Sequence, residues 1–240
     1  MTIIEPPELT EIRAWWKRGI SVCDHSRAFT IAGSRCDQTM PRGMDNPYWE
    51  IVRNLPSIKT DWYGVTPYSR PDQLSVGHRG RLTKRFSWSI PSPGDVAWLE
   101  QILDGRGVVE IGAGAGYWAW QARQARIDVV AYEPQEPADN HDVHGRVYTE
   151  LRRGGHEAAA LHPDRALLIC WPTNDAPWAS EALAAYAGDT LIYIGEGPGG
   201  CCADDGFFEK IDGGWTEVDA STHHVSWWGV HCGMTAYRRG

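Results

Sequence analysis

A run of glycines between a strand pattern and a helix pattern constrains the fold more than any other feature of the sequence. Residues 108–111 read Val-Val-Glu-Ile, which is typical of a buried parallel strand, and residues 117–126 are rich in Ala, Gln and Arg, which favour a helix. The loop between them has the spacing Gly-x-Gly-x-Gly. Glycines let the backbone approach a ligand closely, and a helix start offers unbonded N–H groups and a positive dipole. This loop is therefore predicted to cradle a ligand.

The alternation of strand and helix continues to the C-terminus. Apolar residues recur at helical spacing from Gly94 to Leu103, after a proline-rich start. Parallel strands need a crossover helix, so the alternation predicts a mostly parallel sheet covered on both faces, and the last two strands, with no helix between them, predict an antiparallel C-terminal edge. The seven expected strands are residues 108–111, 128–132, 146–151, 166–171, 190–194, 215–218 and 234–239, and the later helices are residues 155–161, 180–187 and 204–211.

The first 85 residues differ in character from the rest of the chain. They are rich in Pro, Gly and aromatic residues and contain one helix pattern, from Glu8 to Arg18. We expect an irregular cap or substrate-specificity segment over residues 1–85 and an α/β domain over residues 86–240. A basic run from His78 to Arg85 precedes the domain. A solvated loop is the favoured interpretation of this run, and a clamp for a phosphate or carboxylate is the alternative.

An acidic residue stands at the end of the second expected strand of the domain. Glu133 follows the apolar residues 129–132, and a carboxylate there can accept both hydroxyls of a ribose. Together with the glycine loop it predicts a nucleoside-cofactor site. The dinucleotide fingerprint Gly-x-Gly-x-x-Gly has its third glycine where this sequence has Tyr117, which disfavours a dehydrogenase. The alternative is that the glycines form only a tight turn and that Glu133 is a solvated strand end.

Residues 108–117 resemble motif I of the class I S-adenosylmethionine-dependent methyltransferases. Glu110 matches the acidic position of that motif, and Glu133 matches the second acidic position of the family. The resemblance runs from about Ile90 to Arg239 and implies a Rossmann-like α/β fold with S-adenosylmethionine as the cofactor. It further implies that the three glycines pack against the methionine half of the cofactor and that Glu133 holds the ribose.

One departure from the family concerns adenine. The third strand is followed by Gly154 and Gly155, where many members carry an acidic residue that binds the adenine amino group. A backbone contact at either glycine, or the side chain of Glu157, is the expected substitute. The cofactor-binding residues expected on these grounds are Glu110, Gly112, Ala113, Gly114, Gly116, Tyr117, Glu133, Pro134, Gly154 and Trp171.

The loops after the fourth and fifth strands form the expected acceptor side, because ligands of open α/β sheets lie beyond the carboxyl ends of the strands. The first loop resembles motif IV of amino-group methyltransferases only in Pro172 and in its location. Trp171 is expected to wall the pocket, Asn174 to hydrogen-bond the acceptor, and Glu196 to orient or accept its proton. A plain strand-to-helix loop, and a capping or solvated role for Glu196, are the alternatives.

A late segment, His223 to Cys232, concentrates His, Cys and Trp. Its spacing matches no zinc signature, so no metal is expected, and a pocket-lining loop is the favoured interpretation. Tryptophans of the rim loops could enclose a flat substrate or face the sulfonium charge. These rim residues are Trp171, Trp178, Trp227 and Trp228.

Charge and composition limit the partners. The formal net charge of −8 disfavours extended contact with a nucleic-acid backbone. The six cysteines are expected to be reduced thiols of a cytoplasmic protein, since the sequence has no secretory pattern and no apolar run of membrane length. We therefore predict a methyltransferase for a small-molecule or peptide acceptor, with nitrogen or oxygen favoured over carbon. The alternatives are a nucleic-acid base methyltransferase, a non-catalytic S-adenosylmethionine-binding protein and a dehydrogenase that binds NAD.

Overall fold

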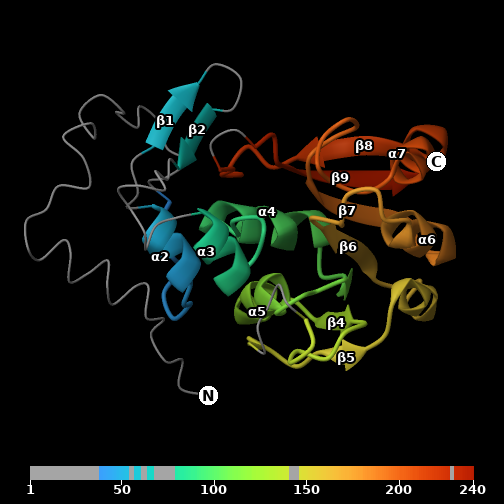
Figure 1. Cartoon of the computed structure of the whole chain (residues 1–240), viewed down its shortest axis with the longest axis horizontal. Coiled ribbons are helices and arrows are strands. Elements are labelled where there is room, and N and C mark those ends of the chain that lie inside the picture. The colour runs from blue at the N-terminus through green and yellow to red at the C-terminus, as the bar shows by residue number, and fades with distance from the viewer. Residues whose placement is uncertain (1–37, 54–56, 61–63, 68–78, 141–145, 228–229) are drawn as a thin grey trace, which may run out of the picture.

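The computed structural model (Figure 1) describes residues 38–53, 57–60, 64–67, 79–140, 146–227 and 230–240. Some of the expectations above concern other residues, whose structure is not described. The helix expected from Glu8 to Arg18 and the residues Cys23, Cys36, His78 and Trp228 lie outside the described residues.

A seven-stranded sheet forms the centre of the domain. Its strands are β3 (Val108–Ile111), β4 (Val129–Glu133), β5 (Arg152–Arg153), β6 (Ala166–Cys170), β7 (Thr190–Gly195), β8 (Trp215–Ala220) and β9 (Gly233–Arg239). They lie in the order β5-β4-β3-β6-β7-β9-β8, and all neighbours up to β7 are parallel. β9 pairs antiparallel with both β7 and β8. The mostly parallel sheet with an antiparallel C-terminal edge is confirmed.

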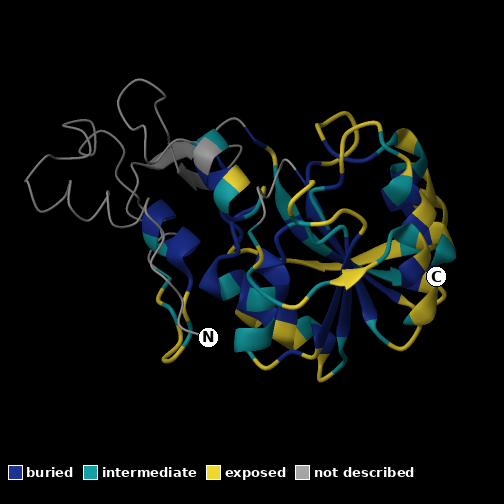
Figure 2. Cartoon of the chain, turned by 60° about the horizontal axis from the view of Figure 1, so that its bottom comes forward, coloured by how far each residue is buried: buried dark blue, intermediate teal, exposed yellow. Residues whose placement is uncertain are grey.

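Helices cover both faces of the sheet, as alternating side chains of the buried strands require. Helices α4 (Pro93–Leu103) and α5 (Tyr117–Gln124) pack on one face, where Val108 and Leu168 point. The other face, with Val109 and Leu167, is covered by η2 (His156–Leu161), α6 (Trp178–Ala185) and α7 (Asp205–Gly214). Figure 2 shows the central strands as buried and the outer surfaces of the helices as more exposed.

Helix α4 begins with a capping box that also anchors a distant loop. The Ser92 hydroxyl accepts a bond from the Asp95 N–H at 3.1 Å, and the Ser92 N–H donates to the Asp95 carboxylate at 3.3 Å. The same carboxylate accepts a bond from the Ser221 hydroxyl at 2.6 Å and lies 3.0 Å from Nδ1 of His224. The cap therefore joins the start of α4 to the segment between β8 and β9.

The N-terminal segment contains more regular structure than its composition predicts. Helices α2 (Pro47–Val52) and α3 (Arg79–Arg85) and the antiparallel pair β1 (Ser57–Thr60) and β2 (Gly64–Pro67) lie in it. The described part is not a detached cap, because α2 and α3 share a third apolar cluster with α5 and with Val225, Trp227 and Val230. Hydrogen bonds also cross this cluster, among them those from the Trp227 indole to the Tyr48 hydroxyl and from the Tyr117 hydroxyl to Asn46.

The third strand of the domain was misplaced by the sequence pattern. Residues 146–151 were expected to form it, but they are irregular, and only Arg152 and Arg153 pair with β4. The side chain of Leu151 instead packs toward Gly116, under the glycine loop. The half-buried Tyr148 donates its N–H to the Ala115 carbonyl of the same loop at 2.9 Å, whereas Val147 is exposed. Tyr148 and Leu151 therefore pack against the loop rather than in the sheet.

Candidate functional site

The glycine loop adopts a backbone that favours glycine at each of its three positions. Gly112, Gly114 and Gly116 have φ angles of 72°, 57° and 71°, in the left-handed region that L side chains rarely adopt. The Ala113 N–H donates to the Tyr132 carbonyl at 2.9 Å, which ties the loop to the end of β4. A Cβ on Gly112 would lie 2.7 Å from the Trp178 ring, so the absence of a side chain leaves room above the loop.

Glu133 lies at the carboxyl end of β4 and faces the glycine loop. Its side chain is buried, and one carboxylate oxygen accepts a bond from the Gly114 N–H at 2.9 Å. The other oxygen accepts bonds from the Gln135 N–H at 3.3 Å and from the Asn140 amide at 3.2 Å. The interpretation of Glu133 as a solvated strand end is therefore wrong.

Glu110 is a second buried carboxylate at the same site. It is 2 % exposed, and its Oε2 atom has no hydrogen-bond partner among the described residues. Burial raises the pKa of Glu110 to about 8, an effect that the Ala119 N–H opposes and the nearby Glu133 reinforces. A buried carboxylate oxygen without a partner costs free energy, which a cationic ligand group beside it would recover.

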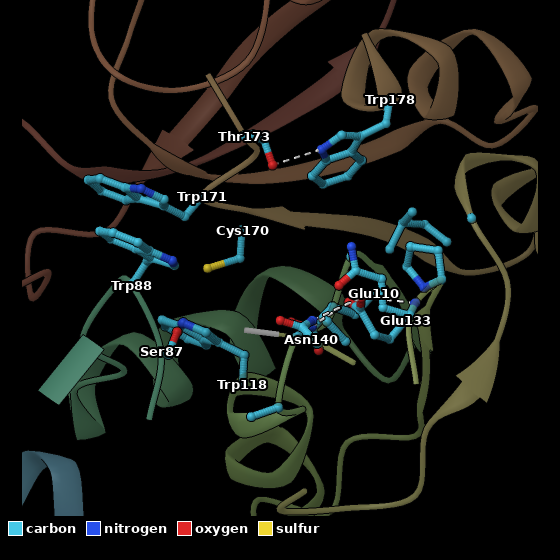
Figure 3. Close-up of a pocket in the computed structure, with 18 of the residues that line it drawn as sticks. Ser87, Trp88, Glu110, Trp118, Glu133, Asn140, Cys170, Trp171, Thr173 and Trp178 are labelled. Atoms are coloured by element: carbon cyan, nitrogen blue, oxygen red, sulfur yellow. Dashed lines mark hydrogen bonds between the residues drawn. The ribbon is translucent and has the colours of Figure 1, made fainter. Parts of the chain in front are cut away.

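One pocket of about 430 Å³ brings these residues together, within the usual range for small-molecule sites. Figure 3 shows that it has two chemically different ends. We call the part around Glu110, Glu133 and Asn140 the acidic end, and the part around Trp88, Trp118 and Trp171 the aromatic end. The pocket is lined by the loop residues Gly112, Ala113 and Gly114, and further by Thr83, Phe86, Ser87, Trp88, Glu110, Ile111, Ala115, Trp118, Glu133, Pro134, Gln135, Asn140, Gly155, His156, Cys170, Trp171, Thr173 and Trp178.

The aromatic end is built from segments far apart in the sequence. Trp88 precedes α4, Trp118 lies in α5, and Trp171 follows β6. The ring centroids of Trp88 and Trp171 are 6.0 Å apart, and the two planes differ by 6°. The Trp118 indole donates to the Ser89 hydroxyl at 2.7 Å, and that hydroxyl lies 3.0 Å from the Cys170 sulfur. Burial raises the pKa of the Cys170 thiol well above its usual value, so this lining atom stays protonated.

Two residues expected on the acceptor side do not line the pocket. Asn174 is exposed, and its amide donates to the neighbouring Asp175 carboxylate at 3.0 Å. Glu196 is buried, and its carboxylate accepts bonds from the N–H groups of His231 and Cys201, each at 2.8 Å. Burial alone would raise the pKa of Glu196, but these two N–H donors hold it below its usual value. The geometry assigns Glu196 to fixing two loops to each other.

Three of the expected cofactor-binding residues also support the pocket from outside its lining. The Tyr117 hydroxyl donates to Asn46 at 2.8 Å and accepts from the Tyr48 N–H at 3.1 Å. A Cβ on Gly116 would lie 2.9 Å from Leu151, so this glycine permits packing beneath the loop. Gly154 packs against the Tyr132 ring, while its neighbour Gly155 lines the pocket. The exposed Glu157, considered for adenine, accepts a bond from the Gly155 N–H at 2.9 Å.

Several lining residues were not anticipated from the sequence, among them Ser87, Trp88, Trp118 and Asn140. Trp118 directly follows the start of the helix after the glycine loop, a position from which a side chain can reach the ligand side. Trp88 stands before the proline-rich helix start, and no local pattern indicates that it faces the sheet edge. Their role depends on packing between distant segments.

The described residues of the segment from His223 to Cys232 are absent from the pocket lining. His224 is 5 % exposed, with Nδ1 beside Asp95 and Nε2 3.2 Å from the Cys232 sulfur. Trp227 packs into the apolar cluster shared with α2. The expectation of a pocket-lining loop is therefore wrong for the described residues of this segment. Nor does any group of three or more metal-ligating side chains occur among the residues that the structure describes.

Comparisons with known proteins add the following. No protein-family model and no curated protein matches the sequence. Among solved structures, magnesium protoporphyrin IX methyltransferase from Synechocystis, with bound S-adenosylmethionine, shares 14% identity over 100% of both chains, with a TM-score of 0.40. An O-methyltransferase from Bacillus cereus in complex with S-adenosylhomocysteine shares 16% identity over 61% of this chain and 80% of its own, with a TM-score of 0.39. A glycopeptide N-methyltransferase shares 13% identity over 61% of this chain and 89% of its own, with a TM-score of 0.41.

The strand order itself decides the fold. In this sheet, six of the seven strands run in the same direction. The seventh, β9, lies between β7 and β8 and runs antiparallel to both. The chain has a Rossmann-like α/β fold with an antiparallel C-terminal edge. Within the described helices, none combines the length and apolarity that crossing a bilayer requires.

Proposed function

We propose that this protein is an S-adenosylmethionine-dependent methyltransferase that acts on a small-molecule or peptide acceptor. The observation that carries the proposal is the Glu110 carboxylate, which is buried at the pocket and has one oxygen that accepts no hydrogen bond from any described residue. The cofactor has an ammonium group that fits such an oxygen, because a buried charge is tolerated when an opposite charge lies beside it.

The charges of the pocket favour a cationic cofactor over a dinucleotide. Among the described lining residues, the acidic side chains are Glu110 and Glu133, and no Lys or Arg lines the pocket. S-adenosylmethionine carries positive charge on its sulfonium and ammonium groups, which these carboxylates would attract. The pyrophosphate of NAD would be repelled by them at the same place, at low effective dielectric constant.

The cofactor roles can be distributed over the acidic end. Glu133 would accept bonds from the ribose hydroxyls in place of its present donors, the Gly114 N–H and the Asn140 amide. Gly112 and Gly114 would let the methionine half approach the backbone, and Glu110 would pair with the ammonium. Gly155 and His156, which line the same region, would lie toward the adenine. Tyr117, Gly116 and Gly154 would act by supporting these contacts.

The chemistry that the cofactor supplies is an electrophilic methyl group on a sulfonium. The task of the protein is then to hold two molecules in line and to exclude water. Trp171, Trp118 and Phe86 provide apolar walls toward the aromatic end, and the protonated Cys170 adds no charge there. We propose that the segment 1–85 acts as a specificity cap over the domain 86–240, since Thr83, near the end of the segment, lines the pocket together with Phe86, Ser87 and Trp88 at the start of the domain.

Isothermal titration calorimetry tests the cofactor assignment. The wild-type protein is expected to bind S-adenosylmethionine and S-adenosylhomocysteine and not NAD. Glu110→Gln should weaken both interactions at least tenfold, since the charge partner of the ammonium is lost. Glu100→Gln, an exposed position on α4, is the matched control and should leave the affinity unchanged.

Binding of NAD in preference to S-adenosylmethionine would refute the proposal. A non-catalytic binding protein is distinguished by its product. Incubation with a cell extract and methyl-labelled cofactor should transfer label to an acceptor and release S-adenosylhomocysteine, whereas a protein that only binds the cofactor gives neither.

A further inference from the structure

The aromatic end of the pocket presents stacked ring surfaces beside the cofactor end. The Trp88 and Trp171 rings are parallel within 6° at a centroid distance of 6.0 Å, and Figure 3 shows the Trp118 ring below them. Aromatic rings attract further flat rings through offset stacking, which saturated rings of the same size cannot match. A stack of indoles at the edge of a pocket is therefore a surface on which another planar ring can continue.

The backbone at Trp171 shows that this ring is held in place at a cost. Its φ angle is 50°, which is a marked outlier for a bulky side chain. The Trp171 N–H donates to the Ile194 carbonyl, and the next residue, Pro172, accepts a bond from the Ala203 N–H. Such strain persists where the surrounding structure fixes it and is found mainly at ligand sites.

The exposure of Trp88 gives an independent indication. Its side chain is 38 % exposed although it lines a pocket, and an exposed large aromatic surface in a concave site is typical of a binding surface. The acidic lining residues Glu110 and Glu133 lie at the other end of the pocket (Figure 3). The polar neighbours of the aromatic end include the neutral hydroxyl of Ser87 and the Arg79 guanidinium, which lies 6.0 Å from the centre of the Trp88 ring. The described aromatic end therefore suits a flat ring with a small polar substituent.

We propose that the aromatic end binds a planar aromatic ring, so that the methyl acceptor is a small aromatic or heteroaromatic compound whose ring stacks on Trp88. This rests on the proposed function, because it assigns the other end of the same pocket to the cofactor. The acceptor class is thereby narrowed from any small molecule or peptide to one that offers a flat ring.

A pair of probes with one skeleton tests the inference by binding rather than turnover. The probes are 2-naphthol, which is flat, and decahydro-2-naphthol, which is saturated, and equilibrium dialysis measures each with the full chain in saturating S-adenosylhomocysteine. The wild-type protein is expected to bind the flat probe about tenfold more tightly, by stacking. Trp88→Leu should abolish this preference, whereas Trp88→Phe should keep most of it. Both variants should retain the affinity for S-adenosylhomocysteine within about threefold.

The outcomes separate this inference from the proposed function. Absence of S-adenosylhomocysteine binding would refute the cofactor assignment, and the dialysis would then be repeated without it, where the same preference is expected. Equal affinities for the two probes, or a preference that Trp88→Leu leaves intact, would overturn the inference while the cofactor assignment stands. Salt-sensitive displacement of 2-naphthol by a single-stranded RNA decamer would also overturn it, since the flat ligand would then be a base of a nucleic acid.

Discussion

The two ends of the pocket are built in different ways. At the acidic end, the polar groups of the protein that line the pocket are the backbone of the glycine loop and two carboxylates on adjacent strands, β3 and β4. At the aromatic end, three tryptophans come from separate segments, and one of them is strained. The first end depends on local geometry that a short motif encodes, whereas the second depends on how distant segments pack. Mutations should therefore affect cofactor binding and acceptor binding separately.

The largest expected effect is that of Gly114→Val on the acidic end. The φ angle of 57° at this position strains any β-branched residue, and a side chain would occupy the space of the cofactor. Affinity for S-adenosylmethionine should fall more than 100-fold, an effect above about 2.7 kcal/mol. Gly197→Val is the control, since a Cβ at Gly197 meets no atom within 4 Å. Calorimetry with circular dichroism measures binding and fold, and unchanged affinity would displace the site from this loop.

Glu133→Ala should weaken cofactor binding by about 1.5 to 3 kcal/mol, through lost charge-assisted hydrogen bonds to the ribose. The wild-type protein should discriminate against a 2′-deoxy analogue of the cofactor, and the variant should not. Calorimetric titration of the cofactor and its 2′-deoxy analogue into the wild-type protein and the variant gives the coupling free energy between Glu133 and the 2′-hydroxyl. If the variant loses affinity equally for the two ligands, Glu133 acts by holding the Gly114 N–H rather than by binding the ribose.

The raised pKa of Glu110 predicts a pH dependence of cofactor binding. With a pKa of about 8 in the free protein, the carboxyl is protonated at pH 6, and the cofactor ammonium binds its ionised form. Affinity should therefore rise up to about tenfold per pH unit from pH 6 to 7.5, with release of a proton. Calorimetry in two buffers of different ionisation enthalpy measures this. Glu110→Gln should flatten the profile, whereas His156→Asn, at the lining histidine, should keep the slope.

The same carboxyl affects stability in the opposite direction. A group whose pKa is raised by folding binds more protons in the native state, so the free energy of unfolding should fall as the pH rises from about 4.5 to about 8. Urea unfolding of the wild-type protein and of Glu110→Gln across this range measures the difference. A wild-type profile that parallels that of the variant would show that Glu110 is already ionised.

The smallest effects on turnover are expected at Asn174 and Glu196, which lie outside the pocket lining. Asn174→Ala should leave turnover within about twofold of wild type.

Glu196→Ala should lower the free energy of unfolding by about 2 kcal/mol, because two backbone N–H groups lose a charged acceptor. Trp171→Ala, in contrast, should reduce kcat/KM for the acceptor. Steady-state kinetics of each variant measures turnover, and thermal melting measures stability. A turnover defect in Asn174→Ala would support the predicted contact between Asn174 and the acceptor.

The sequence by itself predicted the sheet well, because its signals are local. Buried parallel strands are continuous apolar runs, and β3, β4, β6 and β7 each lie within one or two residues of their expected bounds. The weak third strand was misplaced because Tyr148 and Leu151, the half-buried apolar residues before Arg152, pack against the glycine loop rather than pair in the sheet. The N-terminal helices were missed because they are short and gain stability from a shared core rather than from their own pattern.

For the site, the sequence determined the glycine loop and the two acidic positions, because their spacing along one strand, one turn and one helix fixes where they lie. The tertiary structure alone decided which side chains complete the pocket. It placed Trp88 against Trp171, left one oxygen of Glu110 unbonded, and turned Glu196 toward the N–H groups of His231 and Cys201. These contacts join residues far apart in the chain and depend on how whole helices and strands pack. The periodicity of the local sequence indicates secondary structure and does not indicate such contacts.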